Sequence, residues 1–281
     1  MVKKMRRQLA KYRNLAYVKI VSRKLMPDKF FVCNRGIGDT VIFLSRLKEY
    51  YEVYHKKVNI IIPENQYVLV QPYQKYIKRV EVKSIKEVGR IIAAIWENDS
   101  ASKNLQFILP PRADKLLEGD ITLFDLVGNI LNLNGTEFER PFFKWEDGKR
   151  EQLFSQLEIV SKKFAIIAPE AVTVKNVSKD YWKYVVERYH DEGLIVLENG
   201  SAFLEPTFGD KKVFVGLDEM YLLAEDAVSI TSVRSGLSDL LAYTSTPMTV
   251  VYPDTYSYKL YSFKGMPFAG NVIEIVYGGN T

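Results

Sequence analysis

Short apolar runs alternate with longer stretches of helical periodicity along most of the chain. The short runs are typical of strands buried on both faces of a sheet, and the longer stretches predict amphipathic helices. From residue 29 the alternation therefore predicts a parallel sheet covered by helices. The first series predicts strands at 29–34, 57–63, 76–82 and 104–110, with helices at 39–56, 85–98 and 121–134.

The alternation stops over residues 135–150 and then restarts. This segment, GTEFERPFFKWEDGKR, mixes glycine, proline and charged residues without a period, which is typical of a junction. We expect two doubly wound α/β domains, covering 29–145 and 146–281. The second series predicts a helix at about 149–162, strands at 163–169, 194–200, 212–217, 227–233 and 247–253, and helices at 178–193, 218–226 and 235–245.

Residues 1–28 precede both series and predict a helix that Pro27 ends. Residues 1–24 hold nine basic and no acidic residues, whereas the rest of the chain holds more acidic than basic residues. Such a helix either lies on an anionic membrane through residues 1–26, or packs on its own domain with a solvated basic face. Because the basic excess is confined to this segment, nucleic acid is not an expected partner. The apolar residues at mostly helical spacing are Leu9, Tyr12, Ala16, Ile20 and Leu25.

The amino-acid composition limits which cellular compartment and which kinds of catalytic or metal site we expect. The single cysteine, Cys33, excludes an internal disulfide and fits a reducing cytoplasm. With only two histidines, a histidine-ligated zinc site and a Ser-His-Asp triad are both disfavoured. No apolar run reaches the roughly 18 residues that span a bilayer, and the N-terminal segment lacks the apolar core of a signal peptide. We expect a cytoplasmic protein, peripheral on the inner face of the membrane if the N-terminal helix binds there.

A polar loop with two glycines follows the first predicted strand. Ligands of open α/β sheets bind at the carboxyl ends of strands, and glycines let the backbone approach a ligand closely. Asp39 would lie near the start of the next helix, where a plain N-cap is the alternative interpretation. The loop lacks the third glycine of the dinucleotide fingerprint and the Gly-Lys-Ser/Thr of a P-loop. Its candidate ligand residues are Asn34, Arg35, Gly36, Gly38 and Asp39.

A second polar cluster lies where the strand at 227–233 passes into a helix. Unpaired amides and the helix dipole favour phosphate at such a helix start, and Arg234 adds a permanent cation. The alternative is a serine cap beside an incidental arginine. The candidate donor-binding residues here are Arg234, Ser235, Gly236, Leu237, Ser238 and Asp239.

The loop after the strand at 163–169 is a third candidate. It carries Thr173, and Lys179 follows at the start of the next helix. Lys179 could reach a phosphate or could simply be solvated. We interpret Trp182, one turn further on, as a core residue.

These three places together resemble the GT-B glycosyltransferases, most closely the ADP-heptose:lipopolysaccharide heptosyltransferase family. The resemblance spans roughly residues 29–253 and rests on three motifs in order. They are Gly38-Asp39 before a helix and strand, FAIIAPEAVTVKNVSKDYW with Lys179 and Trp182, and YLLAEDAVSITSVRSGLSDLLAYTSTPMTVVYP. The resemblance implies the GT-B fold, in which two Rossmann-like, doubly wound α/β domains face a cleft.

Several positions depart from the family pattern. Arg234 stands where the family has aspartate, Asp239 where it has a helix histidine, and Lys179 and Trp182 have two residues between them instead of one. PEAVT replaces the glycine-rich loop after the second domain's first strand. These departures suggest a divergent branch with a different donor or acceptor.

The resemblance also implies a reaction. The N-terminal domain would bind a cell-surface polysaccharide or glycolipid acceptor, and the C-terminal domain a nucleotide-sugar donor. Transfer would be inverting, with no metal and no cofactor. Asp39 would be the general base, and the helix start at Ser235 and Gly236, with Arg234 and Lys179, would stabilise the leaving diphosphate. A sugar-nucleotide epimerase and a non-catalytic GT-B scaffold protein remain as alternatives.

Overall fold

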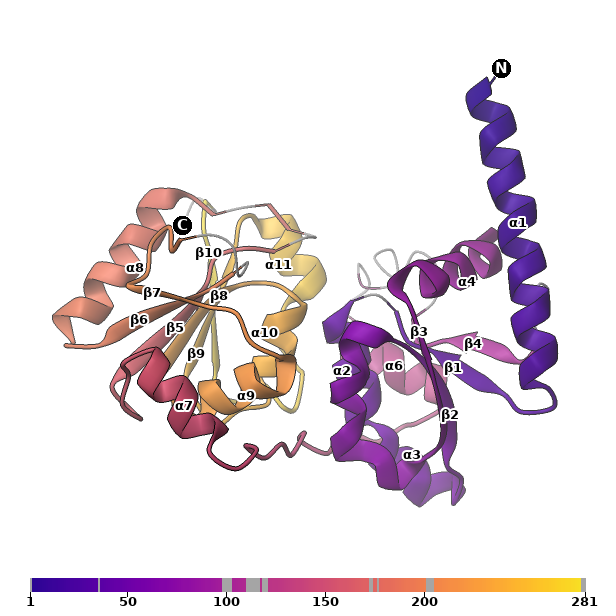
Figure 1. The fold of residues 1–281 in the computed structure, drawn as a ribbon, viewed down its shortest axis with the longest axis horizontal. Coiled ribbons are helices and arrows are strands. Elements are labelled where there is room, and N and C mark those ends of the chain that lie inside the picture. The colour runs from indigo at the N-terminus through magenta and orange to yellow at the C-terminus, as the bar shows by residue number, and fades with distance from the viewer. Residues whose placement is uncertain are drawn as a thin grey trace. The chain divides into compact units, whose positions relative to one another are not determined.

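The computed structural model describes residues 2–34, 36–97, 103–109, 117, 121–171, 174–175, 177–200 and 205–278. The chain divides into two compact units. Unit 1 is Met1–Leu116 with Phe124–Glu139, and unit 2 is Leu117–Leu123 with Arg140–Thr281 (Figure 1). The last crossing, between Glu139 and Arg140, lies in the segment where the sequence alternation stops.

Unit 1 is built on a four-stranded parallel sheet with the strand order β3-β2-β1-β4. Isoleucine and valine dominate the central strands, and every residue of β2 is buried, as expected for a sheet covered on both faces. The α/β fold class is therefore confirmed for this unit. The strands are β1 Phe30–Val32, β2 Val58–Pro63, β3 Ile77–Lys83 and β4 Leu105–Phe107.

The long helix predicted over 39–56 is in fact two helices, α2 (Ile37–Ser45) and α3 (Leu47–Tyr54), which meet at Arg46. The Arg46 guanidinium is buried, forms an ion pair with Glu49 at 2.7 Å and donates to the Gly135 carbonyl at 2.8 Å. A buried charge needs such partners, and Arg46 has one on α3 and the other at Gly135. Three further elements complete the unit: the 3₁₀ segment η1 (Glu64–Tyr76), which the sequence did not predict, α4 (Ile85–Glu97) and α6 (Leu123–Leu131).

Helix α1 (Val2–Leu25) packs through its C-terminal half on α4 and belongs to the core of unit 1. Val18, Val21 and Leu25 are buried there, and the Tyr17 hydroxyl donates to Glu87 at 2.7 Å. In Figure 1 the N-terminal end of the helix extends away from the rest of the unit. No helix in the described part of the chain is both long enough and apolar enough to span a membrane.

Glu87 fixes this attachment and gives it a pH dependence. The carboxylate accepts hydrogen bonds from Ser84 and Tyr17, which lower its pKa from 4.5 to about 2. A lowered pKa stabilises the fold above pH 4.5, and this contribution is lost as the pH falls through about 2. We expect Glu87→Gln to lower the free energy of unfolding by about 1.5 kcal/mol at neutral pH. The deficit should shrink as the pH falls through that window in urea titrations.

The matched control is Glu52→Gln, because Glu52 lies in an exposed pair with Lys48 on α3. Exposed pairs of this kind contribute about 0.3–0.5 kcal/mol. An equal effect of the two substitutions at every pH would contradict the role given to Glu87.

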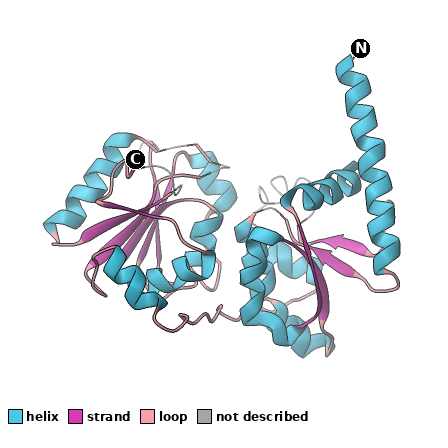
Figure 2. Ribbon diagram, in the orientation of Figure 1, coloured by secondary structure: helices cyan, strands magenta, loops and turns pink. Residues whose placement is uncertain are grey.

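Unit 2 is built on a six-stranded parallel sheet with the order β10-β9-β8-β5-β6-β7. Numbered from β5, this is the strand order 6-5-4-1-2-3 of a doubly wound Rossmann sheet. Figure 2 shows helices on both sides of the sheet. The strands are β5 Phe164–Ala168, β6 Ile195–Asn199, β7 Lys211–Val213, β8 Ser229–Val233, β9 Met248–Tyr252 and β10 Val272–Val276.

The helices of unit 2 follow the predicted series as far as residue 253. Two elements after that residue were not predicted: helix α11, and strand β10, which extends the sheet beyond β9. The helices are α7 Lys149–Gln156, α8 Lys179–Asp191, α9 Leu217–Asp226, α10 Gly236–Leu241 and α11 Thr255–Tyr261.

Candidate active site

Each sheet has one point at which the strand order reverses direction. In unit 1 this point lies between β1 and β4, and in unit 2 it lies between β5 and β8. Open α/β sheets bind ligands outside the carboxyl ends of the strands at such points, because the connections there diverge to opposite faces. The three polar segments singled out in the sequence follow β1, β5 and β8. They therefore lie at the two switch points.

In unit 1, Asp39 lies in the first turn of α2, just beyond β1. The N-cap position belongs to Gly36, which has no side chain for capping, so Asp39 is not the N-cap that one interpretation of the sequence allowed. The Asp39 carboxylate is partly exposed and accepts a hydrogen bond from the Asn34 side chain at 3.1 Å. A Cβ atom at Gly36 would lie 3.0 Å from this carboxylate, so a larger residue there would displace the Asp39 side chain by a few tenths of an ångström.

The backbone beneath Asp39 is held by buried polar groups. Thr40 donates to the Gly36 carbonyl at 3.2 Å and to Gln66 on η1 at 2.7 Å. Burial raises the pKa of Cys33 to about 12, and the Asp39 charge adds to that rise. Cys33 is therefore a neutral core thiol, and among the described residues of this loop Asp39 is a partly exposed carboxylate. Gly38 is buried within α2, and Arg35 lies outside the described residues.

In unit 2, Ser235 begins α10 with a capping box. The Ser238 amide donates to the Ser235 hydroxyl at 3.3 Å, and the Ser235 amide donates to the Ser238 hydroxyl at 2.9 Å. The first backbone amides of a helix have no hydrogen-bond acceptor within the helix. In this cap the Ser235 hydroxyl is the acceptor for the Ser238 amide. The amides of Gly236 and Leu237 take no part in the cap, and both residues are partly exposed.

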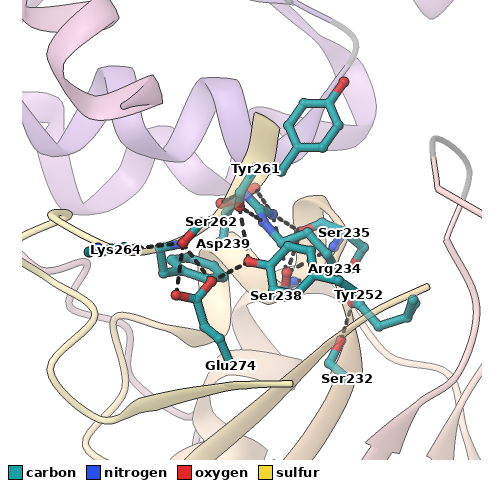
Figure 3. Close-up of polar contacts among 12 residues, drawn as sticks. Ser232, Arg234, Ser235, Ser238, Asp239, Tyr252, Tyr261, Ser262, Lys264 and Glu274 are labelled. Atoms are coloured by element: carbon teal, nitrogen blue, oxygen red, sulfur yellow. Dashed lines mark hydrogen bonds and ion pairs between the residues drawn. The ribbon is translucent and has the colours of Figure 1, made fainter. Parts of the chain in front are cut away.

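Arg234 faces the interior of unit 2 (Figure 3). Its guanidinium forms an ion pair with Asp239 at 2.7 Å, and both side chains are 5% exposed. It also donates to the carbonyls of Tyr261 at 2.7 Å and Ser235 at 2.8 Å, and it lies over the Phe263 ring. Burial raises the pKa of Asp239 above its ordinary value, although Arg234 opposes the rise. The sequence predicted that Arg234 binds the donor directly, and this stays a prediction; in the structure the guanidinium is buried and contacts Asp239, Tyr261 and Ser235.

A carboxylate that the sequence analysis missed, Glu274 on β10, supports the same cluster (Figure 3). It accepts hydrogen bonds from the Tyr252 hydroxyl at 2.6 Å, the Ser262 hydroxyl at 2.9 Å and the Phe263 amide at 2.8 Å. Burial raises the pKa of Tyr252, so this hydroxyl stays protonated and can donate. Glu274 thereby fixes the segment that follows α11. The last residue of α11, Tyr261, accepts a hydrogen bond from Arg234 through its backbone carbonyl.

The third predicted segment leads into α8. Ser178 caps this helix by accepting from the Tyr181 amide at 3.2 Å, and Lys179 is its exposed first residue. Strand β5, which precedes this helix start, pairs with β8, which precedes the Ser235 turn. The two polar segments therefore follow neighbouring strands. Trp182 is buried, as predicted. Thr173 lies outside the described residues.

Glu198 on β6 is a second missed residue, although an acid inside the apolar stretch LIVLENG is an unusual signal. One of its oxygens accepts from the amides of Thr207, Phe208 and Gly209 at 2.7–3.0 Å, and the other pairs with Lys212 at 2.8 Å. Burial alone would raise the pKa of Glu198, but these donors lower it below its ordinary value. Glu198 thus orders the loop before β7.

Among the described residues, no group of three or more histidine, cysteine, aspartate or glutamate side chains is placed to hold a metal ion. The described polar groups at the two switch points include a carboxylate, hydroxyls, backbone amides and a lysine, which suit hydroxylated and phosphorylated ligands.

No family model matches the chain. No curated protein matches it either. Among solved structures, the glycosyl transferase family 9 protein from Veillonella parvula is 13% identical, with a TM-score of 0.63 over 88% of this chain and 87% of that one. The E. coli ADP-heptose lipopolysaccharide heptosyltransferase II is 14% identical, with a TM-score of 0.57 over 88% and 90%.

The E. coli heptosyltransferase WaaC with ADP is 12% identical, with a TM-score of 0.53 over 88% of this chain and 93% of that one. At these identities the likeness is one of fold, and it extends over nearly the whole length of each protein. It confirms the resemblance drawn from the three motifs at the level of architecture. With its two parallel, doubly wound sheets, the chain has the GT-B fold of these glycosyltransferases.

Proposed function

We propose that the protein is a glycosyltransferase that moves a sugar from a nucleotide-sugar donor to a cell-surface glycan or glycolipid acceptor. Unit 2 binds the donor and unit 1 binds the acceptor. The observation that carries this proposal is the placement of the polar segments at both switch points, with a partly exposed Asp39 at one and the Ser235 turn at the other.

The reaction is a displacement at the anomeric carbon with inversion and without a metal. The acceptor hydroxyl oxygen forms the new bond to that carbon while Asp39 accepts the hydroxyl proton. The bond from the carbon to the diphosphate oxygen breaks, and the nucleoside diphosphate leaves with the electron pair. The amides of Gly236 and Leu237, the Ser235 hydroxyl and Lys179 stabilise the charge on that group. Arg234 and Asp239 keep the turn in place.

A nucleotide panel tests the donor half of the proposal. We expect one of UDP, GDP, ADP, CMP or dTDP to raise the melting temperature, since a ligand at a hundred times its Kd stabilises the folded state by about 2.7 kcal/mol. The matching nucleotide-sugar should then be consumed only with an acceptor present. Release of a free epimer without acceptor would instead indicate an epimerase. Nucleotide binding without turnover on any acceptor would indicate a scaffold protein.

We further propose that α1 places the enzyme on the inner, anionic face of the cell membrane. Residues 18, 21 and 25 pack inward, whereas Leu9, Tyr12 and Ile20 are exposed at helical spacing. Val18 follows Leu9 by about two and a half turns, so the exposed apolar stripe lies opposite the packed face. Residues 1–24 also carry nine basic residues, each of which contributes about 1 kcal/mol near an anionic surface.

We expect Leu9→Ser with Ile20→Ser to weaken binding to vesicles of phosphatidylglycerol and phosphatidylcholine by about tenfold or more, because apolar burial of two large side chains is lost. Flotation of the full chain measures this. The control is Val53→Ser with Phe142→Ser, which removes two exposed apolar side chains elsewhere. Unchanged flotation of the α1 variant, or an equal loss in the control, would contradict the membrane role.

A further inference from the structure

A cavity of about 390 Å³ lies in unit 1, away from the Asp39 loop. Its lining comes from the amino ends of β1, β2 and β4 and from the C-terminal ends of α3 and α6. Because all strands of this sheet are parallel, their amino ends form the edge opposite the carboxyl edge that carries Asp39. The chemistry proposed above leaves this cavity without a role.

The cavity is strongly basic. Four exposed lysines line it, and among the described residues none of the lining side chains carries a carboxylate. Charges of one sign gathered around a hollow raise the local concentration of oppositely charged ligands. The cavity therefore favours an anion. The four residues are Lys29, Lys56, Lys57 and Lys103.

One wall of the cavity is aromatic. Tyr50 lies edge-on to Phe31 with ring centroids 6.4 Å apart, and the Tyr54 ring follows at 4.9 Å from Tyr50. The Tyr54 hydroxyl donates to the Asn132 carbonyl at 2.8 Å, which holds the ring in place. Such rings offer an apolar face together with polar edges, a surface that fits the face of a sugar ring.

Asn59 provides an acceptor inside the cavity. Its side chain is only 8% exposed, and its amide nitrogen donates to the Lys29 carbonyl at 2.9 Å. Its carbonyl oxygen, Oδ1, is buried and accepts no hydrogen bond from any residue that the structure describes. Buried acceptors are almost always satisfied, so this oxygen calls for a donor from a ligand, such as a hydroxyl group.

We propose that this cavity binds an acidic glycan, a hydroxylated chain with a carboxylate or a phosphate in its repeating unit. The inference rests on the proposed function, because it makes the cavity a docking site for a remote part of the acceptor. The lysines pair with the anionic groups, Tyr50 and Tyr54 contact the sugar or polyol faces, and Asn59 accepts from a hydroxyl.

Calorimetry on the full chain tests this with three probes of similar length: an oligogalacturonate, an oligo(glycerol phosphate) and a neutral malto-oligosaccharide. We expect at least one anionic probe to bind about tenfold more tightly than the neutral one, with an affinity that falls as salt screens the lysines. The two anionic probes distinguish a carboxylate from a phosphate. Lys56→Gln with Lys57→Gln should weaken that binding about tenfold, as expected for two lost charge contacts.

The matched control is Lys86→Gln with Lys163→Gln, which removes the same charge from exposed positions outside the cavity. Binding of neither anionic probe, equal binding of the neutral probe, or an equal loss in the control would overturn the proposal. The assay needs no donor and no turnover. A protein that binds the acidic probe but transfers no sugar would thus refute the proposed function and leave the cavity assignment standing.

Discussion

Replacement of Asp39 by asparagine should reduce sugar transfer by about 10²–10⁴-fold, the range that a general base contributes. Asparagine keeps an oxygen that can accept from Asn34 and has the same shape, so the loop after β1 should persist. The loss of a negative charge from the first turn of α2 costs only about 0.3–1 kcal/mol. We expect a folded protein with nearly normal donor binding and very slow transfer, measured by single-turnover kinetics with the donor that the nucleotide panel selects.

Asp218→Asn is the matched control, since Asp218 also lies in the first turn of a helix, α9, beyond an edge strand. It should change stability by a similar amount and leave the transfer rate intact. If Asp39→Asn kept most of its turnover, Asp39 would serve only the helix start, and the base would have to lie elsewhere in unit 1.

Removal of the Asp239 carboxylate should cost about 3–5 kcal/mol of unfolding free energy, the usual result when one partner of a buried ion pair is lost. Asp239→Ala leaves the Arg234 guanidinium buried with backbone carbonyls and a serine hydroxyl as its acceptors. Urea unfolding followed by tryptophan fluorescence measures the change, because Trp182 lies in the core of unit 2. Glu192→Ala, which breaks the exposed pair with Arg188, is the control and should cost under about 1 kcal/mol.

The double variant Arg234→Met with Asp239→Leu separates positioning from direct contact. Apolar replacement of both partners should recover most of the lost stability. If Arg234 touched the diphosphate, this folded variant would lose about 1.5–3 kcal/mol of nucleotide affinity, the range for hydrogen bonds to charged groups. We expect a smaller loss of nucleotide affinity, because the guanidinium contacts Asp239 and two backbone carbonyls inside unit 2. A loss of the full amount would return Arg234 to the donor site.

Local patterns predicted most of the strands and helices, because central strands such as β5, Phe164–Ala168, are continuous apolar runs that can be read without distant information. The local patterns did not predict features that depend on contacts between residues far apart in the chain. Arg46, where α2 and α3 meet, contacts Gly135, some ninety residues away in the chain, and the ring of Phe124. Strand β10, Val272–Val276, was not predicted although four of its five residues are apolar, and Glu274 interrupts the run.

The candidate site shows the same limit. The sequence indicated which turns matter, since glycine, serine and aspartate after a strand have local reasons to be there. It could not show that Arg234 faces inward, because this depends on Tyr261, Phe263 and Asp239 together. Glu274 and Glu198 were missed for a related reason, since the amides that they bind come from loops about ten residues away and are brought to them only by the fold.

The chain passes between the two units three times, because Leu117–Leu123 belongs to unit 2 and Phe124–Glu139 returns to unit 1. One recombination junction therefore cannot exchange a whole unit with a related gene. A crossover near residue 140 would carry along the segment that contains the buried Leu117 and Leu123, taken from the wrong parent. Chimaeras that graft a new unit 1 onto this unit 2 will need to keep the native 117–123 segment. Natural exchange of one unit by simple gene fusion faces the same obstacle, which favours change by substitution within each unit.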